Sequence, residues 1–159
     1  MPTVVAGYRA TFRSRPVTTS DIDLMPLRSA PFWDAVERAQ QRLVSRVPIQ
    51  AVGIVQPPYE YEDRLRLLPI RGLKRLQILV PEAHDLALMK VARGEAHDLE
   101  AIEEIHRISP LSLAMLVSRY EESRPQFIGH PANLKLSFLA LVARLFGEEE
   151  AKRVDREIR

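Results

Sequence analysis

The sequence predicts an α+β domain, because its residue pattern changes near Pro81. Before Pro81, short apolar runs and alternating residues favour strands, with one helix among them. After Pro81, apolar residues recur at helical spacing almost without interruption. We therefore expect a small mixed sheet with a flanking helix in residues 1–80, and a C-terminal bundle of helices in residues 81–159 packed on it as one compact unit.

Four segments of the first part are predicted as strands. In residues 21–24 polar and apolar side chains alternate, which places Asp21 and Asp23 on one face of an extended segment. The other candidates, in chain order, are residues 51–55, 63–68 and 75–80. Between the first two strands, residues 31–46 carry apolar side chains at helical spacing and are predicted as a helix.

Prolines, glycines and serines mark the helix ends expected after Pro81. A first helix begins at Pro81 and stops at Gly94, since glycine readily adopts the left-handed conformation that ends many helices. Ser109 and Pro110 are the expected N-cap and first turn of a helix that ends near Tyr120. The remaining segments are a helix over 97–106, a helix from Pro131 or Asn133 to Phe146, and an exposed charged helical tail over 148–159.

Length and composition restrict the class of protein. The chain has 159 residues and no cysteine, which excludes disulfides, thiolate catalysis and cysteine-ligated metal sites. It holds 23 basic and 21 acidic residues, and the formal charge of +2 is too small to indicate nucleic acid or membrane binding by itself. There is no signal-peptide pattern and no stretch of roughly 18 apolar residues. We therefore expect a soluble, cytoplasmic protein with no membrane partner.

Asp21 and Asp23 are the first candidate for chemistry. Two carboxylates two positions apart on a strand can chelate hard cations, and Mg²⁺ usually takes one or two protein carboxylates at about 2.1 Å, leaving other positions to water and phosphates. Such ions stabilise the attacking and leaving oxygens in nucleotidyl transfer. An isolated pair of this kind is more often a solvated strand edge, so the residues alone leave both interpretations open.

Lys90, Arg93 and Asp98 are the second candidate. Lys90 lies four residues after Leu86 and beside Met89, at the border of the apolar face of its helix. A lysine there either extends to water or meets an anion. Because Arg93 follows closely and Asp98 lies just past the predicted helix end, a cluster of the three side chains is sterically reasonable. It can bind phosphate, or it can be an ion pair that joins two helices.

Both candidates belong to four ordered segments of the chain. They are Thr19-x-Asp21-Ile22-Asp23-Leu24, Tyr61-Glu62-Asp63-Arg64-Leu65, Pro81-Glu82-x-x-Asp85-Leu86-x-Leu88-x-Lys90-x-x-Arg93 and His97-Asp98-Leu99-x-Ala101-Ile102. In this order they resemble the motifs of a bacterial nucleotidyltransferase-like family of mostly uncharacterised proteins, similar to the toxin subunits of abortive-infection toxin–antitoxin pairs. The resemblance runs from about residue 4 to about residue 146 and is most specific between Lys90 and Asp98.

The resemblance implies a nucleotidyltransferase-like fold and a role for individual residues. Asp21 and Asp23 would be the metal ligands, with Asp63 as a third carboxylate. Lys90 would hold the nucleoside triphosphate. Asp98 would match an acidic residue of the toxins' active site and would orient or deprotonate the acceptor.

Gly7 and Arg93 would complete the nucleotide site implied by the resemblance. Proteins of this fold usually carry Gly-Gly or Gly-Ser where the phosphate-binding helix opens, whereas Ala6-Gly7-Tyr8 stands at that place here, so the serine that would contact phosphate is missing. The chain also begins only six residues before Gly7, which leaves no room for the helix that commonly precedes this motif. Both departures favour a trimmed fold or a degenerate nucleotide pocket.

The function expected from the sequence is Mg²⁺-dependent transfer of a nucleotidyl group from a nucleoside triphosphate to a hydroxyl of RNA, such as tRNA, or of a protein. The resemblance adds a role in a toxin–antitoxin or defence system, with a cognate antitoxin or another protein as partner. The alternative is a non-catalytic, degenerate nucleotidyltransferase domain that binds a protein or RNA. A third interpretation is a helical scaffold whose polar residues are all structural.

Overall fold

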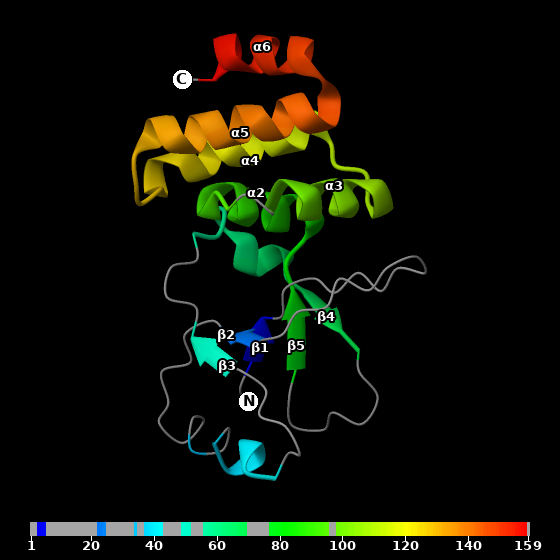
Figure 1. The fold of residues 1–159 in the computed structure, drawn as a ribbon, viewed down its shortest axis with the longest axis vertical. Coiled ribbons are helices and arrows are strands. Elements are labelled where there is room, and N and C mark those ends of the chain that lie inside the picture. The colour runs from blue at the N-terminus through cyan, green and yellow to red at the C-terminus, as the bar shows by residue number, and fades with distance from the viewer. Residues whose placement is uncertain are drawn as a thin grey trace. The chain divides into compact units, whose positions relative to one another are not determined.

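The chain forms two compact units (Figure 1). The structure is a computed structural model that describes residues 3–5, 22–24, 34, 37–42, 49–51, 56–69, 77–95 and 98–158. The first, here called the sheet unit, comprises residues 1–54 and 65–81, and the second, the helical unit, comprises residues 55–64 and 82–159. Strands in the first and helices in the second make the chain α+β. Packing of both as one compact unit stays a prediction.

The sheet unit contains a mixed three-stranded sheet of order β1-β5-β4. Strand β1 (Thr3–Val5) pairs in parallel with β5 (Gln77–Val80), and β4 (Arg66–Leu68) pairs with β5 in the antiparallel direction. In the antiparallel pair Leu67 stands opposite Leu79. Strand β5 falls within the predicted segment 75–80, whereas β1 is not among the predicted strands.

A second, two-stranded parallel sheet pairs β2 (Ile22–Leu24) with β3 (Ile49–Ala51). Strand β2 confirms the strand predicted around Asp23, which stands opposite Gln50. Parallel strands need a long crossover, usually a helix. Helical residues between the two strands, at 34 and 37–40, fit this requirement and the predicted helix.

Strand β3 lies at the start of the segment predicted as a strand over 51–55. It covers Ala51 and the two residues before it, and residues 52–55 lie outside the described part of the chain. The predicted position is therefore supported only at Ala51.

The strand predicted over 63–68 is wrong in its first half. Residues Tyr61–Arg64 form a 3₁₀ helix, η1, and only Arg66–Leu68 form β4. Tyr61 is only 7 % exposed, so η1 turns an aromatic side chain into the protein interior, and this packing overrides the local alternating pattern. Asp63 consequently lies on an exposed 3₁₀ turn of the helical unit and not at the start of a strand.

The helical unit is a bundle. Figure 1 shows α2 and α3 in one layer, α4 and α5 in the next, and α6 outermost. Besides η1, its elements are α2 (Ala83–Arg93), α3 (Asp98–Ile108), α4 (Leu113–Ser123), η2 (Arg124–Gln126), α5 (Pro131–Phe146) and α6 (Glu148–Glu157).

Apolar side chains from all five α-helices of this bundle, α2 to α6, form its core. Phe138 of α5 is fully buried and stacks on Tyr120 of α4, with ring centroids 4.2 Å apart. Ile102 of α3 and Leu116 of α4 are also fully buried. Burial of each such aliphatic or aromatic side chain stabilises the fold by about 1.5–3 kcal/mol, so this core holds the helices that carry the candidate site.

The start of α4 differs from the prediction. The N-cap is Ser112, whose Oγ accepts a hydrogen bond from the N–H of Met115 at 3.4 Å. The predicted cap at Ser109 is wrong. Leu111 is buried, and its N–H donates to Nδ1 of His106 at 3.0 Å, so the chain enters the core before the helix begins. These contacts delay the helix by one turn.

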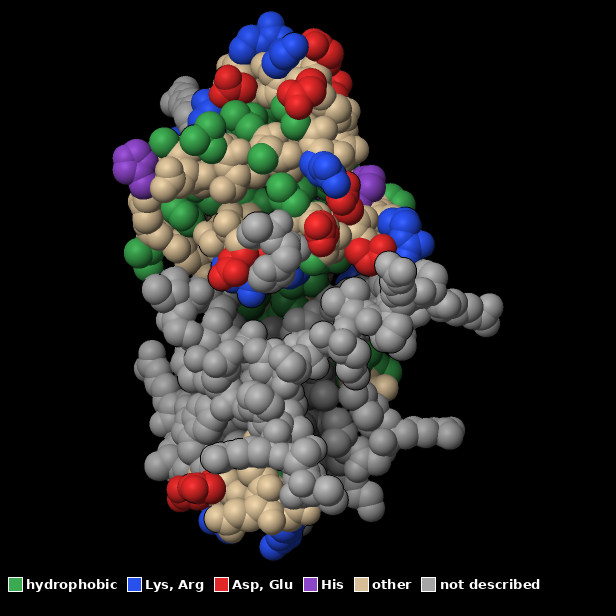
Figure 2. Space-filling view, in the orientation of Figure 1, with side chains coloured by type: hydrophobic (Ala, Val, Ile, Leu, Met, Phe, Trp, Pro, Cys, Tyr) green, Lys and Arg blue, Asp and Glu red, His purple; other side chains and the backbone are tan. Residues whose placement is uncertain are grey.

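The C-terminal segment predicted as an exposed tail is only partly exposed. Helix α6 displays acidic and basic side chains at its surface (Figure 2). Its other face is apolar, and Ala151, Val154 and the following Ile158 are all buried. Their spacing of three and four residues makes one apolar stripe. Lys135 of α5 holds the helix by an ion pair with Asp155, at 3.0 Å.

Candidate functional site

Lys90, Arg93 and Asp98 meet where α2 ends and α3 begins. Lys90 Nζ donates a hydrogen bond to Asp98 Oδ1 at 3.1 Å, and Arg93 Nε donates to Asp98 Oδ2 at 3.0 Å. Arg93 Nη2 also donates to Oδ1, and the backbone N–H of Glu95 donates to Oδ2 at 3.2 Å. The three side chains therefore form the cluster that their spacing predicts, here called the Lys90 cluster. Their roles in function stay predictions.

The turn between the two helices explains this geometry. Gly94 caps α2 in the left-handed conformation, with φ of 72°, and donates its N–H to the carbonyl of Lys90, as its predicted role as a helix stop requires. The chain then enters α3 at Asp98. Basic side chains thus lie at a helix C-terminus and the acid at a helix N-terminus, where the helix dipoles favour each charge.

Hydrogen bonds and neighbouring positive charges keep Asp98 ionised despite its burial. Asp98 is 2 % exposed, while the side chains of Lys90 and Arg93 are 22 % and 45 % exposed. Burial alone would raise the pKa of Asp98, but hydrogen bonds from Arg93 and Lys90, reinforced by their charges, lower it below its ordinary value. One buried anion is therefore bonded to two cations whose side chains are partly exposed to water.

A second buried ion network lies at the other end of α2. Asp85 is fully buried and accepts hydrogen bonds from Arg64 Nε at 2.8 Å, Arg64 Nη2 at 3.1 Å and Arg119 Nη1 at 3.0 Å. Arg119 also donates to Glu82, which in turn contacts His84. These five residues are here called the Asp85 network. They join η1, α2 and α4.

His84 has a defined tautomer in this network. The N–H of Ser112 donates to His84 Nε2 at 2.8 Å, so Nε2 carries no proton, and Nδ1 lies 2.9 Å from Glu82 Oε1 as a donor. Burial would raise the pKa of Glu82, but hydrogen bonds from His84 and Arg119 lower it to about 2. The carboxylates of the network are thus already bonded within the protein, which indicates a structural role.

Little in the sequence points to the Asp85 network. Glu82 and Asp85 are three positions apart, which places them on neighbouring parts of one helical face, and both fall in a segment that carries the family resemblance. Their arginine partners, however, lie 21 and 34 positions from Asp85. Only the packing of separate elements brings them into contact.

Of the four remaining predicted site residues, the structure describes two, Asp23 and Asp63. Gly7 and Asp21 lie outside the described residues, and only the backbone of Asp23 is described, in β2 of the sheet unit. Asp63 is exposed on η1 of the helical unit. Within the described ranges, no three His, Asp or Glu side chains form a group able to hold a metal ion. Metal binding by Asp21 and Asp23 stays a prediction.

Comparison with protein families identifies the kind of protein. A family model with the description "Nucleotidyltransferase of unknown function (DUF6036)" matches residues 9–142. The chain belongs to this nucleotidyltransferase family. The matched range includes β2 and the whole Lys90 cluster. Neither the curated proteins nor the solved structures gave a match.

Membership of this nucleotidyltransferase family confirms the general kind of protein that the sequence motifs suggested. It supports a nucleotide as substrate. The relation to abortive-infection toxins stays a resemblance of motifs. Every helix that the structure describes is too short or too polar to cross a membrane.

Proposed function

We propose that the protein transfers a nucleotidyl group from a nucleoside triphosphate to a hydroxyl of RNA or of a protein, with Mg²⁺ as cofactor. Family membership supports the general activity. The observation that carries the proposal is the Lys90 cluster, in which two partly exposed cations share one buried carboxylate. A charged cluster of this kind suits a polyanionic substrate.

Lys90 and Arg93 are the proposed ligands of the triphosphate. A lysine ammonium has three N–H donors, of which Asp98 accepts one at 3.1 Å. Arginine offers a planar set of donors that matches phosphate oxygens. Charge-assisted hydrogen bonds of both types are roughly twice as strong as neutral ones, so both side chains would contribute to binding a triphosphate at this position.

Asp98 is proposed to position these cations. Its oxygens already accept hydrogen bonds from Lys90, Arg93 and the N–H of Glu95. Its lowered pKa makes it a poor proton acceptor at neutral pH, because an effective general base has a pKa near the working pH. These observations favour orientation over deprotonation, the two roles that the family resemblance leaves open.

Asp21 and Asp23 are the proposed holders of Mg²⁺. The extended backbone of β2 at Asp23 supports this assignment, because the strand predicted over 21–24 would present the side chains of Asp21 and Asp23 on the same face. Carboxylate oxygens are ligands that Mg²⁺ prefers. When bound, the ion would neutralise charge on the phosphates during transfer.

Label transfer tests the activity. The full chain is incubated with Mg²⁺, α-labelled nucleoside triphosphates and either total RNA or total protein, and the labelled product is resolved on gels. We expect transfer by the parent, at least a tenfold loss in Lys90→Met and in the double variant Asp21→Asn with Asp23→Asn, and no loss in Lys152→Met, whose side chain is 65 % exposed on α6. Absence of label, together with no Mg²⁺- and nucleotide-dependent rise in Tm of the parent, would refute the proposal.

A toxin or defence role is part of this proposal and rests on the resemblance of the four motif segments. Candidate partners are tRNA or another RNA as acceptor and a cognate antitoxin. Induced expression in bacterial cells tests it: the parent is expected to arrest growth, whereas Lys90→Met is not. Equal growth of both strains at equal protein levels would remove the toxin role and leave the transferase activity to be judged by label transfer.

A degenerate, non-catalytic domain is the second candidate. It is favoured by the missing serine at Ala6-Gly7-Tyr8 and by the internal pairing of the Lys90 cluster, since Asp98 alone could hold both cations for stability. On this account no acceptor becomes labelled, and Lys90→Met lowers only Tm. The label-transfer experiment therefore separates the two candidates.

A further inference from the structure

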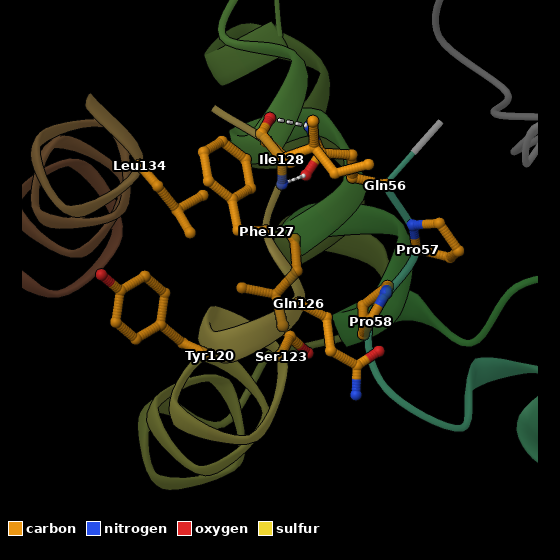
Figure 3. Close-up of a pocket in the computed structure, with 11 residues that line it drawn as sticks. Gln56, Pro57, Pro58, Tyr120, Ser123, Gln126, Phe127, Ile128 and Leu134 are labelled. Carbon is orange, nitrogen blue, oxygen red and sulfur yellow. Dashed lines mark hydrogen bonds between the residues drawn. The ribbon is translucent and has the colours of Figure 1, made fainter. Parts of the chain in front are cut away.

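A pocket of about 210 Å³ opens in the helical unit. Figure 3 shows Pro57 and Pro58 on one side and Tyr120 and Leu134 on the other, with residues after α4 between them. From α2 it receives Leu88 and Ala92, which lie on one helical face. Lys90 is two positions after Leu88 and therefore projects from α2 about 200° away. The pocket is distinct from the Lys90 cluster.

The outer wall of the pocket is held in place by hydrogen bonds. Gln56 Nε2 donates to the carbonyl of Ile128 at 2.6 Å, and the N–H of Ile128 donates to Gln56 Oε1 at 2.7 Å (Figure 3). The N–H of Tyr59 donates to Ser123 Oγ at 3.0 Å. Residues 56–59 are thus tied to the segment after α4 at two points, so the pocket exists before any partner binds.

Large apolar side chains stand exposed at the same place. Ile128 is 78 % exposed and Tyr59 is 44 % exposed. Pro57, Phe127 and Leu134 extend this apolar surface into the pocket. A concave apolar surface with a protruding apolar rim is typical of protein interaction sites.

The segments around the pocket are acidic. Residues 56–64 and 118–130 contain five acidic residues and three arginines, a formal excess of two negative charges in a chain whose total is +2. Two of these arginines are already bonded to Glu82 and Asp85 of the neighbouring network. The third, Arg124, is paired with Glu121. Glu60 and Glu122, next to the residues of the Tyr59–Ser123 bond, are exposed. The surface therefore favours a cationic partner.

Size and charge together define the occupant. Pockets that enclose a whole small ligand measure about 300–1,000 Å³, so a pocket of about 210 Å³ suits a single apolar side chain. The acidic rim repels phosphate, which disfavours nucleotides and nucleic acid. We propose that this pocket binds a segment of a partner protein in which one large apolar side chain is flanked by lysines or arginines. The inference does not depend on the proposed transferase activity.

Designed peptides test the proposal on the full chain. The probe is a fluorescein-labelled peptide with one phenylalanine between two blocks of three lysines. We expect saturable binding by fluorescence anisotropy, and at least tenfold weaker binding when alanine replaces the phenylalanine or glutamates replace the lysines. Backbone NMR shifts should change at Ser123, Phe127 and Ile128, and not at Asp98.

Matched variants distinguish peptide binding at the pocket from non-specific binding to the protein surface. Ile128→Ala and the double variant Glu60→Gln with Glu122→Gln are each expected to weaken binding at least fivefold. Leu136→Ala and Glu149→Gln remove a similarly exposed apolar side chain or charge elsewhere and should leave it unchanged. Equal binding by all variants refutes the proposal.

Other occupants give distinct results. Binding of the glutamate peptide or of a mononucleotide at Ser123 and Ile128 would assign the pocket to another class of ligand. Concentration-dependent dimerisation that Ile128→Ala abolishes would assign it to a second copy of the chain. Either outcome overturns the proposal, and neither bears on whether label is transferred at the Lys90 cluster.

Discussion

Arg64 donates two hydrogen bonds to the fully buried Asp85, from Nε at 2.8 Å and from Nη2 at 3.1 Å. Arg64 is the last residue of η1, and Asp85 lies in the first turn of α2. The same guanidinium donates from Nη2 to the carbonyl of Tyr59 at 2.6 Å. One side chain thus ties the segment that forms the pocket wall to the helix that carries Lys90.

Arg64→Ala is expected to destabilise the helical unit substantially. It removes two donors from a carboxylate that has no access to water, and breaking a buried pair in this way costs about 3–5 kcal/mol. Arg119 remains as a partner of Asp85, so we expect the lower end, about 3 kcal/mol, by urea unfolding. Arg153→Ala removes an exposed pair with Glu150 and should cost less than about 1 kcal/mol. Equal losses would show that the Asp85 network adds nothing beyond a surface pair.

Glu82 makes stability depend on acid pH. Its pKa is lowered to about 2 in the folded protein, from an ordinary value of 4.5. Because the folded pKa is below the unfolded one, the stabilisation is complete above about pH 4.5 and is lost as pH falls toward 2. Asp98, whose pKa is also lowered, acts in the same direction. Urea unfolding between pH 6 and pH 2.5 should show a steeper loss for the parent than for Glu82→Gln, and parallel curves would contradict the proposed contribution.

Ser112 and Ser109 provide a direct test of where α4 begins. Ser112→Ala removes the Oγ that accepts a hydrogen bond from the N–H of Met115 at the start of α4. This change is expected to lower the free energy of unfolding by about 1 kcal/mol. Ser109→Ala should change the free energy of unfolding by no more than about 0.5 kcal/mol, because Ser109 caps no helix in the structure. A larger loss of stability in Ser109→Ala than in Ser112→Ala would instead show that the helix begins at the cap that the Ser-Pro pattern predicts.

Asp98→Asn distinguishes a positioning residue from a general base. Under the proposed function, Asn keeps the shape but holds Lys90 and Arg93 less firmly, so we expect a rate about tenfold or more lower with an unchanged shape of the pH profile of kcat/KM. Loss of a general base would remove the acidic limb of that profile. The measurement is label transfer between pH 5.5 and 9, with Glu149→Gln as control.

Local sequence patterns were sufficient to predict a structural feature where the contacts that form it are close in sequence. The Lys90 cluster spans nine positions and depends on one helix, one turn and the start of the next helix. Gly94 marks that turn because its backbone conformation suits glycine. The strand around Asp23 was likewise visible as alternation.

The wrong assignments share one cause. The start of the 63–68 segment, the cap at Ser109 and the exposed tail were inferred from patterns a few residues long. In the structure, Tyr61, Leu111 and Val154 are buried by residues from other elements. Burial of Tyr61 and Leu111 changed the local conformation, and burial of Val154 covered a helix face that the charged sequence pattern predicted to be exposed to solvent.

The amino-acid order was enough to predict the α+β class, the absence of cysteine chemistry, the Lys90 cluster and the nucleotidyltransferase kind. It could not reveal the Asp85 network or the pocket, whose contacts join residues as far apart as Gln56 and Ile128, 72 positions along the chain. Periodicity and capping act over one or two helical turns. Contacts between distant segments arise only when the elements pack, because that packing decides which polar groups lose water and must find partners within the protein.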